Sequence, residues 1–249
     1  MRIILSRKGF DSTAGGVPSP IVKGRPVSFP IPEKPPSPTT YNSLGLGDLV
    51  VAATRSRLTG DSNCHDDPLF ADGYCWFGQS GAAQGHLRKQ GVCEGDVFLF
   101  FGLFADPESG ERHHRIFGFM RVARVAQANV IAMTQGWLEP PRPHPHLSDK
   151  ARKQNTIYFG PGATANNADD KLRLTIHGGP LNRWRLPEWF SQFGLSYHAQ
   201  PERWLGNGQL DSAKRGQEFV CNTGEDEEAR RWLEDMIAQM MRPASTDMY

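Results

Sequence analysis

The chain has 249 residues, of which 38% are hydrophobic and 22% are charged, and its formal net charge is +1. This composition is typical of a globular protein. It excludes a disordered chain, which combines low hydrophobicity with high net charge, and a polycation that binds nucleic acid through net charge alone. Any contact with nucleic acid therefore needs a local patch.

The sequence favours a cytoplasmic protein without a membrane span. It has no apolar run of about 18 residues, which a spanning helix needs. The first apolar run, Ile3–Leu5, is followed by Ser-Arg-Lys and is too short for a signal peptide. The cysteines form no CxxC pair, so we expect reduced thiols; they are Cys64, Cys75, Cys93 and Cys221.

The first third of the chain predicts one strand, an extended arm and loops. Met1–Ser6 is apolar enough for a buried strand. Residues 12–40 contain many prolines, which remove backbone donors, so we expect an extended arm over the fold rather than a central element. Residues 47–52 predict a turn that enters a strand. Residues 59–75 are rich in Asp, Asn and Gly and predict a loop.

The middle of the chain gives the strongest strand signal. Val97–Phe104 is a continuous apolar run of a length that suits a fully buried strand, and Arg115–Val125 predicts the returning strand after a polar loop. Residues 79–90 allow a short helix, although Gly81 and Gly85 weaken it. We expect the two strands to form the centre of the fold.

The last part of the chain predicts short elements and one long helix. Leu172–Ile176 is a strand candidate and Pro187–Phe193 a helical turn. Glu225–Met241 has apolar residues at intervals of three or four and an acidic first turn, as an amphipathic helix requires. No linker divides the chain, so we expect one α+β domain over residues 1–249, with a bent or barrel-like, mostly antiparallel sheet, flanking helices and this C-terminal helix.

The first candidate site follows the opening strand. Arg7, Lys8 and Asp11 precede Gly15 and Gly16 in a loop that can hold an anionic group, because arginine grips phosphate and glycines let backbone N–H groups approach it. The spacing matches no known phosphate-binding fingerprint. The alternative is a solvated turn in which Asp11 caps local backbone donors.

The second candidate site is Cys-His-Asp-Asp-Pro at residues 64–68. His65 beside carboxylates such as Asp67 supplies either a general base with its orienting partner or ligands for a divalent metal. The alternative is a plain turn before Pro68. A zinc site drawing on Cys64, His65 and Cys75 does not fit the usual ligand spacing.

Other candidates are scattered along the chain. The motif Pro143-His144-Pro145-His146 holds its histidines in an extended backbone, which suits presentation to a cleft. His198 and the pair Gln217-Glu218 lie beside apolar residues and are therefore expected to be fixed in place. The whole dispersed set is Gln79, His86, His113, His114, His144, His146, His198, Gln217 and Glu218.

Several motifs, in order, resemble those of the nucleotide modification associated domain 3 family. They are SRKGFDSTAGGVPSPI, CHDDP, LSYH and GQEFV, with GDVFLFFGLF and IFGFMRVARV between them, and they span nearly the whole chain. The resemblance implies a link to modified bases in DNA. The motif residues that it marks are Arg7, Lys8, Asp11, Gly15, Gly16, His65, Asp67, Gln79, His198, Gln217 and Glu218.

A looser resemblance covers only residues 79–125. A short helix, a buried strand, a polar loop and a returning strand with glycine are similar to the centre of PUA-like domains, including the EVE and ASCH groups. This resemblance implies a small β-barrel that holds RNA or an extruded modified base.

Two main functions follow, both with a nucleotide or nucleic acid as partner. The first is an enzyme that modifies nucleotides or bases, in which Arg7 and Lys8 hold phosphate. Acid–base groups or ligands for a divalent metal then come from Asp11, His65, Asp67 and His198. The substrate is bound by Gly15, Gly16, Gln79, Gln217 and Glu218.

The second function is a module that only recognises a modified base, with Trp76, Phe77 or Tyr197 stacking on the base and Gln79 or Gln217 forming hydrogen bonds to its edge. A scaffold for other enzymes is a third option. The first function requires that these distant polar groups share one cavity.

Overall fold

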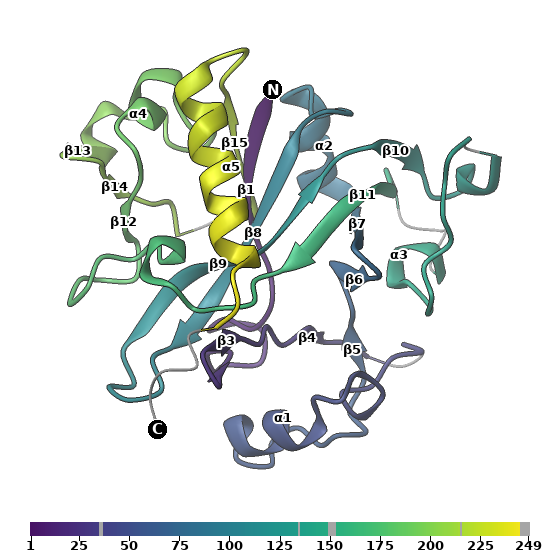
Figure 1. The fold of residues 1–249 in the computed structure, drawn as a ribbon. Helices are drawn as coiled ribbons and strands as arrows, with labels where there is room; N and C mark the ends of the chain where they lie inside the picture. Colours follow the sequence, from purple (N-terminus) through teal and green to yellow (C-terminus); the bar gives the residue numbers. More distant parts are fainter. Residues whose placement is uncertain (35–36, 134, 149–152, 215, 245–249) are drawn as a thin grey trace.

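The computed structural model describes residues 1–34, 37–133, 135–148, 153–214 and 216–244. Its main element is an eight-stranded mixed sheet that curls into a half barrel (Figure 1). The order of the strands is β15-β1-β8-β9-β11-β7-β6, and β10 pairs with β11. Their bounds are β1 Arg2–Arg7, β6 Leu69–Ala71, β7 Tyr74–Gln79, β8 Val97–Ala105, β9 Arg112–Arg121, β10 Arg124–Gln127, β11 Thr156–Thr164 and β15 Glu218–Asn222.

The smaller elements surround this sheet. The α-helices in the described ranges are α1 Gly47–Thr54, α2 Gly81–Lys89, α3 Pro145–Ser148, α4 Trp189–Phe193 and α5 Glu227–Met241. The short strands are β2 Ile21–Val22, β3 Arg25–Pro26, β4 Ile31–Pro32, β5 Cys64–His65, β12 Arg183–Arg185, β13 Trp204–Gly206 and β14 Gln209–Asp211. No described helix combines the length and the apolar character that crossing a membrane requires.

The central strands are those with the longest apolar runs. Every residue of β8 except Ala105 is buried, and β8 forms an antiparallel pair with β9, as predicted. The opening strand β1 runs parallel to β8 on its other side and antiparallel to β15. Because a strand buried on both faces must be apolar throughout, these runs identified the centre of the sheet correctly.

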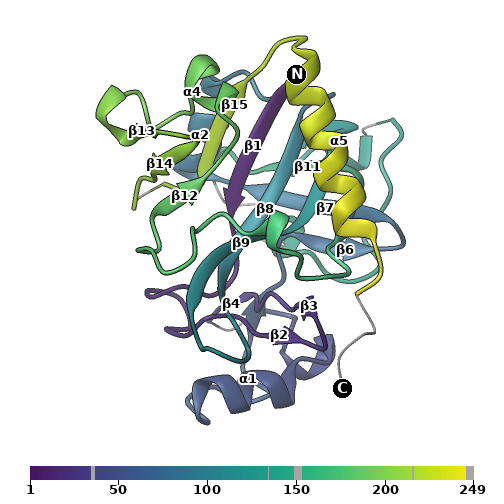
Figure 2. The ribbon, with the colours of Figure 1, turned by 60° about the vertical axis from the view of Figure 1, so that its left-hand side comes forward.

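Successive residues of β8 supply the cores on the two faces of the sheet. Leu99 and Phe101 lie in a cluster with Leu233 of α5. Phe98 and Phe100 point to the opposite face, where they pack in a second cluster. Helix α5 lies across the first face (Figure 2). It confirms the predicted C-terminal helix and begins at Glu227, where the side chain of Asp226 accepts a hydrogen bond from the N–H of Ala229.

The proline-rich segment is anchored by aromatic side chains. Phe10, Phe29 and Tyr41 are fully buried together with Val50 of α1 and Cys64 of β5. The arm predicted over residues 12–40 contains β2, β3 and β4 and lies beside one end of the main sheet (Figure 1), while residues 35–36 lie outside the described ranges. This packing places the loop after β1 close to strand β5, which contains His65.

Three expectations for local structure were wrong. Residues 47–52 form helix α1 rather than a strand, because Leu46, Leu49, Val50 and Ala53 face the same aromatic cluster at helical spacing. Leu172–Ile176 makes only isolated bridges, to Arg115 and Trp184, since its neighbours change along its length. The predicted loop 59–75 includes strands β5 and β6 and the start of β7.

Candidate active site

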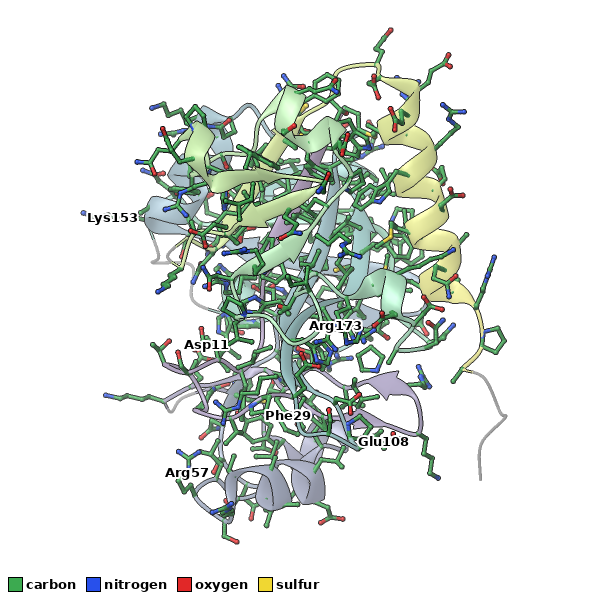
Figure 3. All side chains as sticks on the ribbon, turned by 90° about the vertical axis from the view of Figure 1, so that its left-hand side faces the viewer. Asp11, Phe29, Arg57, Glu108, Lys153 and Arg173 are labelled. Atoms are coloured by element: carbon green, nitrogen blue, oxygen red, sulfur yellow. The ribbon has the colours of Figure 1, made fainter. Side chains whose placement is uncertain are left out.

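A polar cavity of about 290 Å³ lies where β1, β7 and the loop before β15 come together. The loop after β1 supplies one wall, and His65, Asp67 and His146 supply another. In Figure 3, Asp11 of this first wall lies between the main sheet and the N-terminal segment that contains Phe29. The lining residues are Arg7, Lys8, Gly9, Asp11, Thr13, Ala14, Ile31, His65, Asp67, Gly78, Gln79, Ser80, His146, Gly216 and Gln217.

The carboxylate of Asp67 is held in a fixed orientation. Its Oδ1 accepts a hydrogen bond of 2.8 Å from the backbone N–H of Gly78, and Nε2 of His144 lies 3.2 Å from the same oxygen. Burial alone would raise the pKa of Asp67, but the neighbouring His144, His146 and His65 outweigh it and hold the pKa below its usual range. Asp67 is therefore an anion at neutral pH, although its side chain is only 5% exposed.

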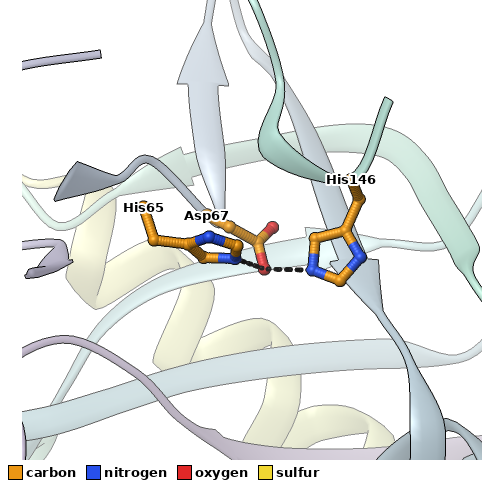
Figure 4. A group of neighbouring side chains, drawn as sticks. All are labelled: His65, Asp67 and His146. Atoms are coloured by element: carbon orange, nitrogen blue, oxygen red, sulfur yellow. Dashed lines mark ion pairs between the residues drawn. The ribbon is translucent and has the colours of Figure 1, made fainter. Parts of the chain in front are cut away.

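Two imidazoles face the other oxygen of Asp67 (Figure 4). Nε2 of His65 and Nε2 of His146 each lie 3.9 Å from Oδ2. The three ligand atoms lie within 4.8 Å of one another, so the residues can hold a metal ion. Burial lowers the pKa of His146 to about 4, although Asp67 acts in the opposite direction. His146 is therefore neutral at pH 7.

The second nitrogen of each imidazole has its own partner. Nδ1 of His65 lies 3.1 Å from Oε1 of Glu33, and Nδ1 of His146 lies 2.7 Å from Oδ1 of Asn155. The amide of Asn155 also donates to the carbonyl of His146 at 2.7 Å. These contacts turn both Nε2 atoms toward Asp67.

A second polar group, formed by Lys8, Gln79 and Glu218, also lies at the cavity. Nζ of Lys8 donates to Oε1 of Glu218 at 2.9 Å and stands 4.2 Å from the ring centre of Phe77. The side-chain amide of Gln79 donates to the same carboxylate oxygen at 2.8 Å. The other oxygen, Oε2, is buried and has no hydrogen-bond partner among the described residues. Lys8 and Gln79 line the cavity, while Glu218 lies behind them and fixes their positions.

Arg7 and Asp11 line the cavity, but their polar atoms are largely engaged. The guanidinium of Arg7 donates to the carbonyls of Lys214 and Ala213, at 3.0 Å and 3.3 Å. Oδ1 of Asp11 accepts from the N–H groups of Thr13 and Ala14, at 2.7 Å each. Burial would raise the pKa of Asp11, yet these bonds and Arg7 lower it. Asp11 therefore caps its own turn, which was the alternative interpretation of this loop.

Gly15 and Gly16 shape the loop behind the cavity, and neither is among its described lining residues. Both have positive φ angles, of 77° and 72°. A Cβ atom at Gly15 would lie 2.3 Å from Cδ2 of Phe10. Glycine is required there because the loop passes directly over this buried ring.

His198 lies outside this set of lining residues. Its Nδ1 is 2.8 Å from the carbonyl of Ser196, and its Nε2 accepts a hydrogen bond of 2.9 Å from the N–H of Ala213. The ring packs edge-on against Phe219. With both nitrogens engaged by backbone, His198 braces the loop before β15.

Seven of the residues predicted for the site line this one cavity, and Glu218 supports two of them. The seven are Arg7, Lys8, Asp11, His65, Asp67, Gln79 and Gln217. Sequence reasoning did not commit to His144, His146, Glu33 or Asn155 as site residues. The only signal for the two histidines was the Pro-His-Pro-His motif, and none pointed to Glu33 or Asn155.

Comparison with models of protein families assigns the chain to a family. The family model described as nucleotide modification associated domain 3 matches residues 2–222. The chain belongs to this family. Membership of the nucleotide modification associated domain 3 family suggests a role in nucleotide or DNA modification and a nucleotide or nucleic acid as ligand. Comparison with the curated proteins and with the solved structures gives no match.

Proposed function

We propose that this chain is an enzyme that acts on a nucleotide or a nucleic-acid base held in the cavity between Lys8 and Asp67. The observation that carries the proposal is the convergence of Lys8, Gln79, His65, Asp67 and His146 from distant parts of the chain on one cavity. Convergent polar groups in a concave site, including groups with shifted pKa values, are typical of active sites.

The size and lining of the cavity suit a small polar ligand. Its volume of about 290 Å³ lies at the lower end of the range for small-molecule sites, about 300–1,000 Å³. The amide of Gln217 offers a donor and an acceptor, which the edge of a base requires. The amide of Gln79 donates one N–H to Glu218 and accepts from the N–H of Ser80, which leaves its second N–H and the second lone pair of its oxygen for a ligand. In this proposal Gln79 and Gln217 orient the base, and the group of His65, Asp67 and His146 performs the chemistry.

The competing function, recognition of a modified base without chemistry, has less support. It requires an aromatic ring in the pocket on which the base stacks. The described lining residues include no Phe, Tyr or Trp. Trp76 and Phe77 are buried, and Tyr197, which is 50% exposed, lines a different cavity.

The proposal is tested by looking for a covalent product. The purified chain is incubated with nucleoside monophosphates and, separately, with single- and double-stranded oligonucleotides, with and without divalent metal ions. Digested nucleosides are then scanned by mass spectrometry. We expect a mass change that is lost in His65→Ala and in Asp67→Asn.

Tyr197→Ala is the matched control, because it removes an exposed ring outside the cavity. The enzyme proposal expects this variant to keep its turnover. Tight binding of a modified oligonucleotide without a covalent product over several hours, together with loss of that binding in Tyr197→Ala, would overturn the proposal in favour of a recognition module.

A further inference from the structure

We propose that His65, Asp67 and His146 form a site for one first-row divalent transition-metal ion. The ligand atoms are Nε2 of each histidine and Oδ2 of the aspartate (Figure 4). This inference goes beyond the proposed function, because binding of the ion is measured without any nucleotide. It also gives a role to His146, which the family motifs quoted from the sequence do not include.

The hydrogen bonds of His146 determine which of its nitrogens carries the proton. The side-chain N–H₂ of Asn155 donates to the carbonyl of His146, so its Oδ1 is the atom that faces the ring. A carbonyl oxygen only accepts, and therefore Nδ1 of His146 is the donor. Nε2 is therefore the nitrogen that faces Asp67, at 3.9 Å from Oδ2, and the one placed to bind an ion.

The same reasoning applies to His65. Its Nδ1 lies 3.1 Å from a carboxylate oxygen of Glu33, which also only accepts. With Nδ1 directed to Glu33, Nε2 is the nitrogen that faces the cavity, and it lies 3.9 Å from Oδ2 of Asp67. Histidines that bind metals commonly donate their other N–H to a carboxylate or a carbonyl, which orients the ring and raises its basicity. Both histidines of this group follow that pattern.

The two carboxylate oxygens of Asp67 have different neighbours. Oδ1 accepts from the N–H of Gly78 and faces His144. Nδ1 of His144 accepts from the N–H of His146 at 3.2 Å, so the ring proton lies on Nε2, the nitrogen that faces Oδ1 of Asp67. Oδ2 faces the Nε2 atoms of His65 and His146, at 3.9 Å from each. A cation among these three atoms is attracted by the Asp67 carboxylate and can be bound by both nitrogens.

The distances agree with such an ion. Divalent zinc binds nitrogen and oxygen at about 2.0–2.2 Å, so ligand atoms around one ion lie about 3–4 Å apart. The two distances from Oδ2, 3.9 Å each, fall in this range. The two nitrogens lie within 4.8 Å of each other.

The charges around the cavity also favour a cation. Among the described lining residues, the carboxylates Asp11 and Asp67 match the cations Arg7 and Lys8 in number. Two further carboxylates contact lining residues from behind, Glu33 at His65 and Glu218 at Lys8. Lys8 is already paired with Glu218, and Arg7 with backbone carbonyls. A bound divalent ion offsets the excess negative charge and lets a phosphate-bearing ligand approach.

The ligand set indicates the class of metal. Two imidazoles and one carboxylate suit iron, cobalt, nickel or zinc, whereas magnesium and calcium prefer sites made of oxygen atoms. Three protein ligands leave coordination positions open. In this arrangement the open positions face the cavity, as in catalytic rather than structural sites.

The test is direct titration of the full chain after treatment with a chelator. Calorimetry with Zn²⁺, Co²⁺, Mn²⁺ and Mg²⁺ gives affinity and stoichiometry, and the visible spectrum of bound Co²⁺ reports its coordination. We expect one equivalent of Zn²⁺ or Co²⁺ to bind, weaker binding of Mn²⁺ and no saturable binding of Mg²⁺. Glu33→Ala, which removes only the partner of His65, should weaken metal binding by about 10- to 100-fold. His65→Gln and His146→Gln each remove a ligand and should weaken it by more than that.

His177→Gln is the matched control, because His177 is exposed and pairs with Asp170 outside the cavity. It should bind the metal with the affinity of the wild type. Circular dichroism and thermal unfolding verify that each variant is folded, and His65, at the cavity surface, is the safest ligand to change. Absence of saturable binding by the folded wild type would overturn the proposal, as would wild-type affinity in both His65→Gln and His146→Gln. Neither result would decide whether the cavity binds a nucleotide.

Discussion

The imidazole of His146 packs against the backbone of Gly78 so closely that no side chain fits between them. A Cβ atom at Gly78 would lie 2.3 Å from Cγ of His146. The N–H of the same Gly78 donates to Asp67. One residue of β7 therefore positions two members of the group formed by His65, Asp67 and His146.

This relationship predicts the effect of Gly78→Ala. The added methyl group must displace His146, and overpacking of this kind costs about 1–3 kcal/mol. We expect urea unfolding to show that loss, and titration with Co²⁺ to show an affinity at least about 10-fold weaker than that of the wild type. Wild-type stability and affinity in Gly78→Ala would contradict the packing described here.

Gly85→Ala is a contrasting prediction in a nearby helix. At Gly85 in α2 the nearest atom to an added Cβ is the end of the flexible Gln154 side chain, at 3.4 Å. Alanine has a higher helix propensity than glycine and restricts the unfolded chain. We expect the free energy of unfolding to rise by about 0.5–1 kcal/mol, with metal affinity unchanged. A loss of stability would mean that Gln154 cannot move aside.

The central part of the fold was predictable from the sequence because its signals are local. The apolar runs of β1 and β8 and the spacing of apolar residues in α5 each fit one kind of element. The run at residues 47–52 misled because Leu-Val-Val-Ala favours a strand locally. The aromatic cluster around Phe29 and Tyr41, formed by distant residues, stabilises a helix there instead.

The site was predictable only as a set of residue types. The sequence favoured His198 over His146, because His198 belongs to the motif LSYH, whereas His146 stood only in the motif Pro-His-Pro-His. The contacts that distinguish them come from residues distant in the sequence. Asn155 orients His146 toward Asp67, whereas Nε2 of His198 already accepts a hydrogen bond from the N–H of Ala213. No local pattern contains that information, because it depends on how loops far apart in the chain meet.

The ion pair of Lys8 and Glu218 gives a third prediction. Both side chains are at least nine-tenths buried, and Glu218 also holds Gln79. Glu218→Gln leaves the Lys8 ammonium without its counter-charge, and breaking a buried pair in this way costs about 3–5 kcal/mol. We expect urea unfolding to show a loss of this order.

The control for this prediction is the double variant Lys8→Met, Glu218→Gln. If the pair is coupled, the double variant is more stable than the sum of the two single variants implies, by about 0.5–3 kcal/mol. Additive single effects would show that the two charges act independently.

The stability of the chain should fall in weak acid because of His113. Its ring is fully buried in β9, where Nε2 accepts a hydrogen bond of 3.1 Å from Nε of Arg115. Burial and the neighbouring Arg115 lower the pKa of His113 to about 4. A histidine in the unfolded chain titrates near pH 6.5. Below that pH the unfolded chain therefore binds a proton at His113 that the folded chain does not bind. The contribution of His113 is therefore complete above about pH 6.5 and is lost as the pH falls toward 4.

Between pH 7 and pH 5 we expect the free energy of unfolding to drop by about 1–2 kcal/mol through the protonation of His113. His113→Gln, compared with the wild type by urea unfolding at both pH values, should show a drop smaller by that amount. An equal drop in the free energy of unfolding of the two proteins would mean that protonation of His113 does not cause the loss of stability in acid.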